Sequence, residues 1–330
     1  YGGAGNDYFD SSVVVPGETV AGDYIRPGSG SNTIVGNAAL FTANSGLDMS
    51  YADVTGSGGI VVTVGNNGTG TTTSVNAGVI NDSFSYAYWF EGTSDVDSMT
   101  GSGNANYEGW SGLAGNDTLD GGLGYDELVY DNDASWGGAA AINVNFSTGQ
   151  ATDGFGNTDT FSNMDAVRGT SKADVFTGSA NVGFISYRGL AGNDTVIGSS
   201  ATDRVDFNRD ARSGGTAGVT VNLTTGVATD GFGDTDTLTN IDDVRGTDQA
   251  DSVVGNSGNN RLEGLAGNDI LDGQDGNDTL VGGSGYDTLK GGAGNDYFDC
   301  STTADGDYIS PGTGSNTIVG NASLFSANLG

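Results

Sequence analysis

A nine-residue repeat, G-G-x-G-x-D-x-U-x with U a large apolar residue, runs almost unbroken from about residue 242 to 299. Asp or Asn stands two residues before each apolar residue. The apolar position recurs at Val244, Val253, Leu262, Leu271, Leu280, Leu289 and Phe298. So short a period leaves room for one tight turn and one short strand, so it predicts a stack of narrow coils. We expect Leu262, Leu271, Leu280, Leu289 and Phe298 to be buried in two facing rows.

The turns between the strands are rich in potential oxygen ligands. In 282–287 (GGSGYD) and 291–296 (GGAGND), glycines permit positive φ and leave carbonyls uncovered, and one carboxylate follows at a fixed spacing. Two repeats complete one coil, so alternate turns stack on the same side. A cation between stacked turns would meet carbonyls and carboxylates, which suits the roughly six to eight oxygens of calcium better than the tight octahedron of magnesium. Zinc is implausible, because the chain has no histidine and one cysteine.

These repeats resemble those of the RTX, or haemolysin-type, calcium-binding family. The match is strong over 242–299, 2–10 and 112–128, and partial at 189–205, where GSSATD replaces a second glycine-rich turn before Asp203. The resemblance implies an all-β fold, a parallel β-roll or β-solenoid that is disordered without calcium. It also implies type I secretion and folding in the calcium-rich exterior, at an extracellular or cell-surface location.

We therefore predict several bound calcium ions, held by aspartates and by the glycine-rich turns that precede them. Asp269 and Asp287 should lie on one side of the roll, and Asp278 and Asp296 on the other. The predicted aspartate ligands are Asp7, Asp117, Asp126, Asp194, Asp251, Asp269, Asp275, Asp278, Asp287 and Asp296. The predicted glycine positions are Gly264, Gly267, Gly273, Gly276, Gly282, Gly285, Gly291 and Gly294.

The charge balance agrees with cation binding. The chain has 10 basic and 42 acidic residues, a net charge of -32, and such self-repulsion in a compact body needs a counter-charge. Its 60 glycines raise the entropic cost of ordering, so the metal-free form should be unfolded or loose. No stretch of 18 apolar residues and no basic patch occurs, so we expect neither membrane insertion nor nucleic-acid binding.

Longer repeats indicate hairpin-containing modules between the nonapeptide segments. The segment 169–178 lies 77 residues before its relative 246–255, and 151–160 keeps the same offset from 228–237. The segment 219–229 predicts two short strands joined by a turn. The expected organisation is an RTX coil at 1–46, a divergent aromatic-rich module at 47–124, related modules at 125–202 and 203–272, and an RTX β-roll at 273–330 that leads into the next repeat.

The end of the chain repeats its beginning. Residues 291–299 are identical to 2–10, and 306–330 match 22–46 at 20 of 25 positions. We expect the sequence to be a window from a longer tandem array, because solenoids gain length by adding repeats. Copies of the chain, joined end to end, are therefore the predicted partners. The single cysteine, Cys300, allows no internal disulfide.

The first module departs from its relatives over 78–93, where aromatic residues cluster. Period-two alternation over 84–90 predicts one strand with aromatics on one face. Two interpretations stay open for it. The strand belongs to the core, or Tyr86, Tyr88 and Trp89 form a lateral interface with a neighbouring copy or another partner, since large exposed aromatics mark association surfaces.

Catalytic chemistry is sparse in this sequence. Without histidine, the Ser-His-Asp, Cys-His and H-E-x-x-H arrangements are excluded. Carboxylate pairs of the glycosidase type remain, and the acidic residues that break the repeat are Glu91, Glu108, Glu127, Glu263 and Asp275. Each is better explained as a solvated side chain or an added calcium ligand, so we do not expect an enzyme.

The function that these features favour is a calcium-stabilised structural repeat of a secreted bacterial filament, sheath, surface layer or adhesin stalk. Two alternatives stay open. One is an adhesin module that binds a cell surface or its polysaccharide. The other is the RTX tail of a secreted hydrolase or epimerase.

Overall fold

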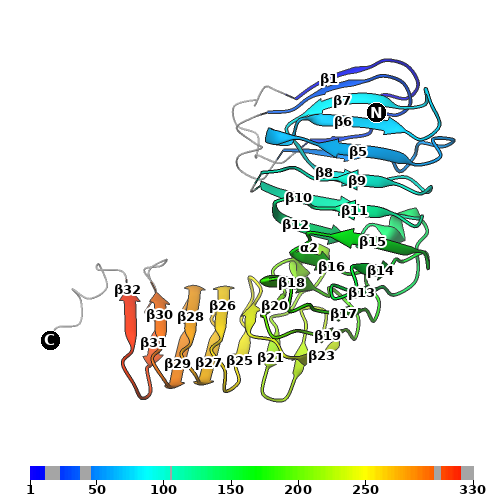
Figure 1. Ribbon diagram of the computed structural model, residues 1–330. Coiled ribbons are helices and arrows are strands. Elements are labelled where there is room, and N and C mark those ends of the chain that lie inside the picture. Colours follow the sequence, from blue (N-terminus) through cyan, green and yellow to red (C-terminus); the bar gives the residue numbers. More distant parts are fainter. Residues whose placement is uncertain (12–22, 38–45, 105, 301–305, 321–330) are drawn as a thin grey trace. The chain divides into compact units, whose positions relative to one another are not determined.

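Figure 1 shows the computed structural model, which describes residues 1–11, 23–37, 46–104, 106–300 and 306–320. The chain divides into two compact units, Tyr1–Thr170 and Ser171–Gly330. In the described residues both units consist almost wholly of short β-strands, most of them paired in parallel. The all-β, parallel solenoid predicted from the nine-residue period is confirmed. None of the described helices is long and apolar enough to cross a membrane.

In the first unit the strands belong to two sheets, with short 3-10 helices η1 (Asn66–Gly68) and η2 (Asp133–Trp136) in the connections. One sheet contains β1 (Tyr8–Asp10), β3 (Thr33–Val35), β5 (Ile60–Val64), β6 (Gly70–Ser74), β7 (Asn81–Ser85), β9 (Ser98–Thr100), β11 (Thr118–Asp120), β13 (Asn143–Asn145), β14 (Gln150–Thr152) and β15 (Thr158–Ser162). The other contains β2 (Tyr24–Ile25), β4 (Leu47–Ser50), β8 (Ala87–Glu91), β10 (Asn106–Ser111), β12 (Gly124–Val129) and β16 (Ala166–Arg168).

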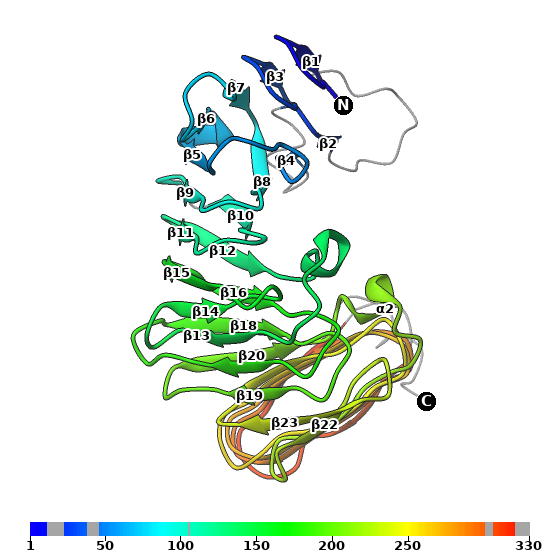
Figure 2. The ribbon, with the colours of Figure 1, turned by 90° about the vertical axis from the view of Figure 1, so that its right-hand side faces the viewer.

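The second unit has the same two-sheet construction and one short helix, α2 (Asp210–Ser213). One sheet contains β17 (Val175–Thr177), β19 (Thr195–Ile197), β21 (Thr220–Asn222), β22 (Val227–Thr229), β23 (Thr235–Thr239), β25 (Ser252–Val254), β27 (Ile270–Asp275), β29 (Thr288–Ala293) and β31 (Tyr308–Ser310). The other contains β18 (Phe184–Arg188), β20 (Thr202–Asp206), β24 (Asp243–Arg245), β26 (Arg261–Ala266), β28 (Thr279–Ser284), β30 (Tyr297–Cys300) and β32 (Thr317–Gly320). Figure 2 views its C-terminal coils nearly end-on, where they overlap as one flattened loop.

Three antiparallel strand triplets are inserted into the parallel stacking. They are β5–β6–β7, β13–β14–β15 and β21–β22–β23. In the last, Val221 lies opposite Ala228, and Gly226 adopts a φ of 70° in the connecting turn, a conformation that glycine adopts without strain. The predicted pair of strands within 219–229 is therefore confirmed.

The apolar residues of the nonapeptides form two buried rows in the second unit. In one sheet Val253, Leu271 and Leu289 pair in register. In the other the row is Val244, Leu262, Leu280 and Phe298. All seven side chains are fully buried, so the burial predicted for Leu262, Leu271, Leu280, Leu289 and Phe298 is confirmed. Because strand side chains alternate, the residues beside them point outward, and a narrow coil has no other interior.

The predicted aromatic strand over 84–90 is wrong. The chain breaks at Tyr86, whose φ is 61°, so β7 and β8 lie in different sheets. The pairing of β4 with β8 then skips Tyr88, because Leu47 lies opposite Ala87 and the next pair contains Trp89. This bulge turns both Tyr88 and Trp89 to the partly exposed face, whereas Ala87 and Phe90 are buried.

The division between the two units falls inside the predicted module 125–202. The proposed module boundaries stay predictions.

Candidate metal centres in the glycine-aspartate turns

Aspartates of stacked turns form hydrogen-bonded columns. In the second unit the Asp251 N–H donates to Asp269 Oδ1 (2.8 Å), and the Asp269 N–H donates to Asp287 Oδ1 (2.9 Å). A second column has the same form, since the Asp278 N–H donates to Asp296 Oδ1 (3.0 Å). Asp269 therefore stacks with Asp287 and Asp278 stacks with Asp296, as the sequence predicts.

The second carboxylate oxygen in these columns is buried and lacks a hydrogen-bond donor. This is so for Oδ2 of Asp269, Asp278 and Asp296. The same holds for Oδ2 of Asp7, Asp117 and Asp194, and for both oxygens of Asp126. A buried anionic oxygen without a donor is costly unless a cation neutralises it. These oxygens are therefore suited to bind a cation.

Two glycine positions shape each turn. A Cβ on Gly264, the first glycine of its repeat, would lie 2.1 Å from Asp269 Oδ2 and 2.6 Å from the Gly282 carbonyl oxygen. At the fourth position Gly285 has a φ of 132°, and a Cβ there would lie 1.6 Å from the Gly267 carbonyl oxygen. Only glycine tolerates both conditions. At Gly273, Gly282 and Gly291 a Cβ would likewise meet Oδ2 of the aspartate of the same repeat. Gly267, Gly276 and Gly294 have a positive φ and lie close to a carbonyl oxygen of the preceding coil, as Gly285 does.

The donors of these turns fit calcium. Asp269 Oδ2 and the Gly282 carbonyl oxygen both lie close to Gly264, and Asp296 Oδ2 and the Pro311 carbonyl oxygen both lie close to Gly291. Among the described residues no three acidic or thiol side chains are grouped so that they could hold a metal ion, so backbone oxygens would have to complete the shell. An oxygen-only, mixed carboxylate and carbonyl set is the environment that calcium takes. The ion would cross-link successive turns and offset the charge of their carboxylates.

Burial raises the pKa of these carboxyl groups. Desolvation, with smaller contributions from neighbouring aspartates, raises the pKa of Asp269 to about 7 and that of Asp278 to about 6. The same cause raises the pKa of Asp117 and of Asp194 to about 9. Folding without a cation thus favours the protonated carboxyls more than the unfolded chain does, whereas calcium favours the charged form. Ordering of the turns and cation binding are therefore coupled.

A second class of turn holds its aspartate by hydrogen bonds to both carboxylate oxygens, and Asp251, one of the predicted ligands, belongs to it. Asp251 Oδ2 accepts the Thr247 N–H (2.7 Å), and Oδ1 accepts the Val219 N–H (2.7 Å) and the Thr247 hydroxyl (2.9 Å). Asp251 thus has a donor at each carboxylate oxygen and needs a cation less than the aspartates with a donor-free oxygen do. Two further turns use the same arrangement, Thr93 with Asp97 and Ser199 with Asp203.

The two classes of turn differ in their amino-acid sequence. Turns whose aspartate keeps a donor-free oxygen have glycine at the fourth position, as in GLAGND (264–269). Turns closed by a hydroxyl have Thr or Ser at the second position and no fourth glycine, as in GTDQAD (246–251). Ser and Thr hydrogen-bond readily to nearby groups, so they replace the cation as the partner of the carboxylate.

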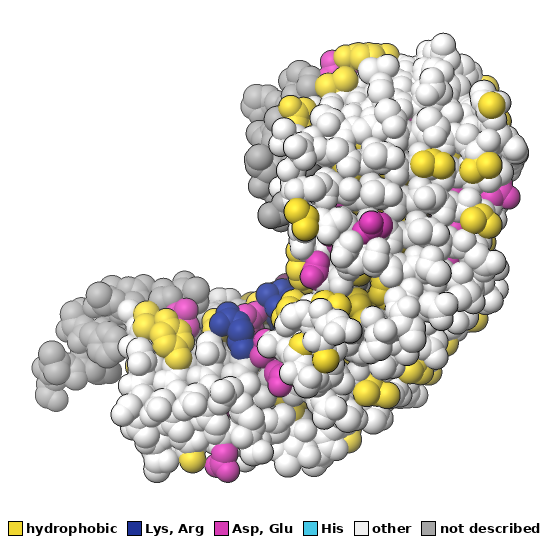
Figure 3. Space-filling view, viewed as in Figure 1, with side chains coloured by type: hydrophobic (Ala, Val, Ile, Leu, Met, Phe, Trp, Pro, Cys, Tyr) yellow, Lys and Arg dark blue, Asp and Glu magenta, His cyan; other side chains and the backbone are white. Residues whose placement is uncertain are grey.

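Asp275, another predicted ligand, is exposed at the end of β27. The structure does not bring it into either aspartate column. On the face shown in Figure 3 few carboxylates reach the surface, in keeping with the many buried aspartates.

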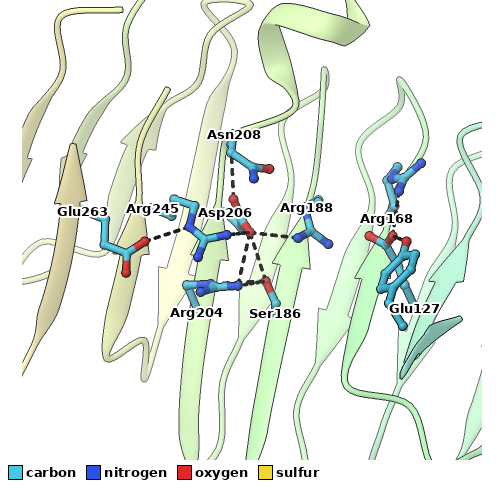
Figure 4. Close-up of polar contacts among 10 residues, drawn as sticks. Glu127, Arg168, Ser186, Arg188, Arg204, Asp206, Asn208, Arg245 and Glu263 are labelled. Carbon is cyan, nitrogen blue, oxygen red and sulfur yellow. Dashed lines mark hydrogen bonds and ion pairs between the residues drawn. The ribbon is translucent and has the colours of Figure 1, made fainter. Parts of the chain in front are cut away.

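Three of the glutamates that break the repeat are paired with donors. Glu127 contacts Arg168 at 2.6 Å, and Glu263 contacts Arg245 at 2.8 Å (Figure 4). Glu91 accepts hydrogen bonds from Tyr24, Ser50 and Trp136. In the second unit, Figure 4 also shows buried Asp206 in contact with three arginines, Arg188, Arg204 and Arg245, at 3.0, 3.3 and 3.4 Å. Each of these carboxylates therefore has an ion-pair or hydrogen-bond partner from another strand or connection.

The aromatic residues proposed for a lateral interface are packed within the first unit. The Trp89 ring lies on Gly109, where a Cβ would be 2.2 Å from it, and the Arg168 guanidinium is 4.9 Å from the ring centroid. The ring centroids of Tyr88 and Tyr107 are 5.9 Å apart. Tyr88 and Trp89 remain partly exposed, and the lateral interface stays a prediction.

Comparison with known families identifies the repeats. A model of the RTX calcium-binding nonapeptide repeat matches in four copies, at residues 111–128, 186–211, 245–280 and 272–299. No curated protein was found to match the chain. The matched segments contain every donor-free aspartate oxygen of the columns described above except that of Asp7. These segments match the RTX calcium-binding nonapeptide repeat, the repeat that the glycine and aspartate spacing of the chain resembles.

Proposed function

We propose that the chain is one period of a calcium-stabilised structural array on a bacterial surface or in its exterior, such as a filament, sheath, surface layer or adhesin stalk. RTX repeats are calcium-binding repeats typical of secreted bacterial proteins. Export by a type I system is part of the proposal. The role is structural rather than catalytic, because the acidic residues are explained by stacked turns or by ion pairs.

One observation carries the proposal: the same coil occurs at two places in the chain. β1 pairs with β3 as β30 pairs with β32, with Phe9 opposite Ile34 and Phe298 opposite Ile318. Matching hydrogen bonds hold both coils, from the Asp7 N–H to Asn32 Oδ1 (2.8 Å) and from the Asp296 N–H to Asn316 Oδ1 (2.7 Å). A coil that keeps its register on repetition is suited to a tandem array, because each coil contacts only its neighbours.

The test is electron microscopy of native material with and without a calcium chelator, together with far-ultraviolet circular dichroism. We expect calcium-dependent filaments or sheets and loss of β-structure on chelation, because cation binding is coupled to ordering. Isolated globular monomers in calcium would refute the array. β-structure that survives chelation unchanged would refute the stabilising role of the ion.

A lateral contact around Tyr86, Tyr88 and Trp89 is a second proposal, supported by the bulge that turns two of these residues outward. Tyr88→Ser should separate laterally associated fibres and leave the calcium response unchanged. If the face instead binds a surface polysaccharide, the same variant should lose retention on that polysaccharide and keep fibre association. Unchanged behaviour in both assays would remove this face from the interface.

A further inference from the structure

The basic residues of the chain gather in one part of the second unit. Seven of the ten lysines and arginines fall within residues 172–261. They are Lys172, Arg188, Arg204, Arg209, Arg212, Arg245 and Arg261. Residues 172–261 contain one turn of the form G-x-x-G-x-D, whereas 264–299 contain four such turns and a single basic residue, Lys290. Positive side chains are therefore concentrated where glycine-aspartate turns are scarce.

Charged side chains form two outward rows across β20, β24 and β26. The rows consist of Arg204, Asp243 and Arg261, and of Asp206, Arg245 and Glu263. Val244 and Leu262, which alternate with them along β24 and β26, are buried, so the rows lie on the outer face of the sheet. In both rows an arginine lies directly opposite a carboxylate at each step. Opposite charges in such positions stabilise the pairing of the strands.

Arg245 links three strands of this face (Figure 4). Its Nη1 lies 3.4 Å from Asp206 Oδ2 on β20, and its Nε donates to Glu263 Oε2 on β26 at 2.8 Å. The Asp206 side chain is fully buried, and Arg188 and Arg204 contact the same Oδ2 at 3.0 and 3.3 Å. These carboxylates therefore have arginine partners, whereas the aspartate columns have oxygens without a donor.

The arginines change the charge state that folding favours. Desolvation raises the pKa of Glu263, but hydrogen bonds and charges from Arg245 and Arg261 outweigh it and lower the pKa below its ordinary value. At Asp269, in the next turn along the chain, desolvation prevails and raises the pKa to about 7. Folding without a metal thus favours the charged form of Glu263 and disfavours the charged form of Asp269.

Two turns of this region hold a carboxylate by donors at both oxygens. Asp203 Oδ1 accepts the Tyr187 hydroxyl at 2.8 Å, and its Oδ2 accepts the Ser199 N–H and hydroxyl at 2.5 and 2.9 Å. Asp251 is held by Thr247 and by a further backbone N–H. These two turns therefore close without a cation.

A third turn has a neutral amide in place of the carboxylate. Asn260 Oδ1 accepts the Asn256 N–H at 2.8 Å, and the Asn260 amide nitrogen donates to the Asp242 carbonyl oxygen at 2.7 Å. Residues 199–263, all of which the structure describes, keep one buried carboxylate oxygen without a donor, Asp230 Oδ2. The shorter segment 264–296 keeps such oxygens on Asp269, Asp278 and Asp296. The coils of 199–263 therefore need a cation less than those that follow.

We propose that residues 199–263 hold their fold without calcium and form the folding nucleus on which the calcium-dependent coils of 264–299 order. The inference rests on the proposed calcium-stabilised fold and adds an order of assembly to it. In a solenoid each coil packs only on its neighbours, so ordering propagates from a coil that is already folded. Leu262 of the nucleus pairs in register with Leu280, so it offers a buried contact to the coils that follow.

Hydrogen exchange of the full chain, followed by mass spectrometry of its peptides, tests the inference. In calcium both segments should be protected. In a calcium chelator, peptides within 279–293 should exchange at the rate of an unfolded chain, whereas peptides within 243–263 should exchange at least about tenfold more slowly than that. Loss of protection in both segments would overturn the inference and leave the calcium-stabilised array intact. Protection that survives in both would refute the calcium dependence of the fold, and the proposed function with it.

Arg245→Gln tests the role of the ion pairs, because it removes the guanidinium that joins β20 to β26. In chelator the exchange of peptides within 243–263 should become about tenfold faster than in the native chain. Lys290→Gln is the matched control, since it removes an exposed ion pair with Asp272 (3.7 Å) from the calcium-dependent coils and should leave that exchange unchanged. Equal exchange within 243–263 in the two variants would overturn the role given to the arginines.

The order of assembly is tested on the native chain, without any variant that fails to fold. Pulse labelling after calcium is added to chelated protein should find 243–263 protected from the start, and 264–299 should gain protection afterwards. Protection that arises first in 264–299 would overturn the folding nucleus.

Discussion

Leu280→Ala is the sharpest test of the stacked core and of its coupling to calcium. Leu280 is fully buried, in register between Leu262 and Phe298. Removing a buried leucine side chain to alanine costs about 3 kcal/mol, within a usual range of roughly 2 to 5 kcal/mol. A coil one side chain thick has little freedom to collapse around the cavity. The free energy of unfolding in saturating calcium should therefore fall by about that amount.

The same substitution should shift the calcium dependence of folding. Four column aspartates surround this roll, Asp269, Asp278, Asp287 and Asp296. If about four ions bind as the roll orders, a loss of about 3 kcal/mol in folding free energy corresponds to roughly 0.75 kcal/mol per ion. The calcium concentration at the folding midpoint should then rise by about 3.5-fold. Urea unfolding in excess calcium gives the first quantity, and circular dichroism during a calcium titration gives the second.

The matched control is Val281→Ala, on the next residue of β28, whose side chain points to the other face and is only half-buried. It should cost less than about 1 kcal/mol and hardly move the calcium midpoint. Equal losses for the two variants would show that the assigned register is wrong. A stability loss at Leu280 with no shift in the midpoint would show that folding and calcium binding are not coupled in this roll.

Three further outcomes follow from the turns. Asp269→Asn should reduce the number of bound calcium ions, whereas Asp251→Asn should leave it unchanged, because Thr247 already satisfies the Asp251 carboxylate. Equal numbers of bound ions for the two variants in equilibrium dialysis would contradict the division of the turns into two classes. Burial raises the pKa of Asp194 to about 9 and that of Asp269 to about 7, above the unfolded value of about 4. The metal-free chain should therefore gain stability as the pH falls from about 9 toward 4. Circular dichroism of metal-free protein that shows no such gain would refute this. Gln274 has a φ of 76°, so Gln274→Gly should relieve strain and stabilise the roll by up to about 1 kcal/mol in urea unfolding; a loss of stability would contradict that assignment.

The nine-residue spacing was sufficient to predict the repeating coil, its buried rows and most of its candidate ligands. Local chemistry explains this success: each repeat contains its own glycine turn, its own carboxylate and its own inward residue, such as Leu271, so the pattern specifies the turn and strand without distant information. The two classes of turn also differ in sequence, because the hydroxyl-closed class has a residue such as Thr247, whose hydroxyl donates to the Asp251 carboxylate.

Tertiary structure decided the features that depend on how one strand meets another. Alternation of aromatics predicted a single strand, but Tyr86 turns the chain into the other sheet, and only the pairing of β8 with β4 places Tyr88 in a bulge. Asp206 and Arg245 are 39 residues apart, and only the register of β20 on β24 places them opposite each other, where their side chains form an ion pair. Register is set by backbone hydrogen bonds between strands that are distant in the sequence, so the identity of the two side chains does not predict it.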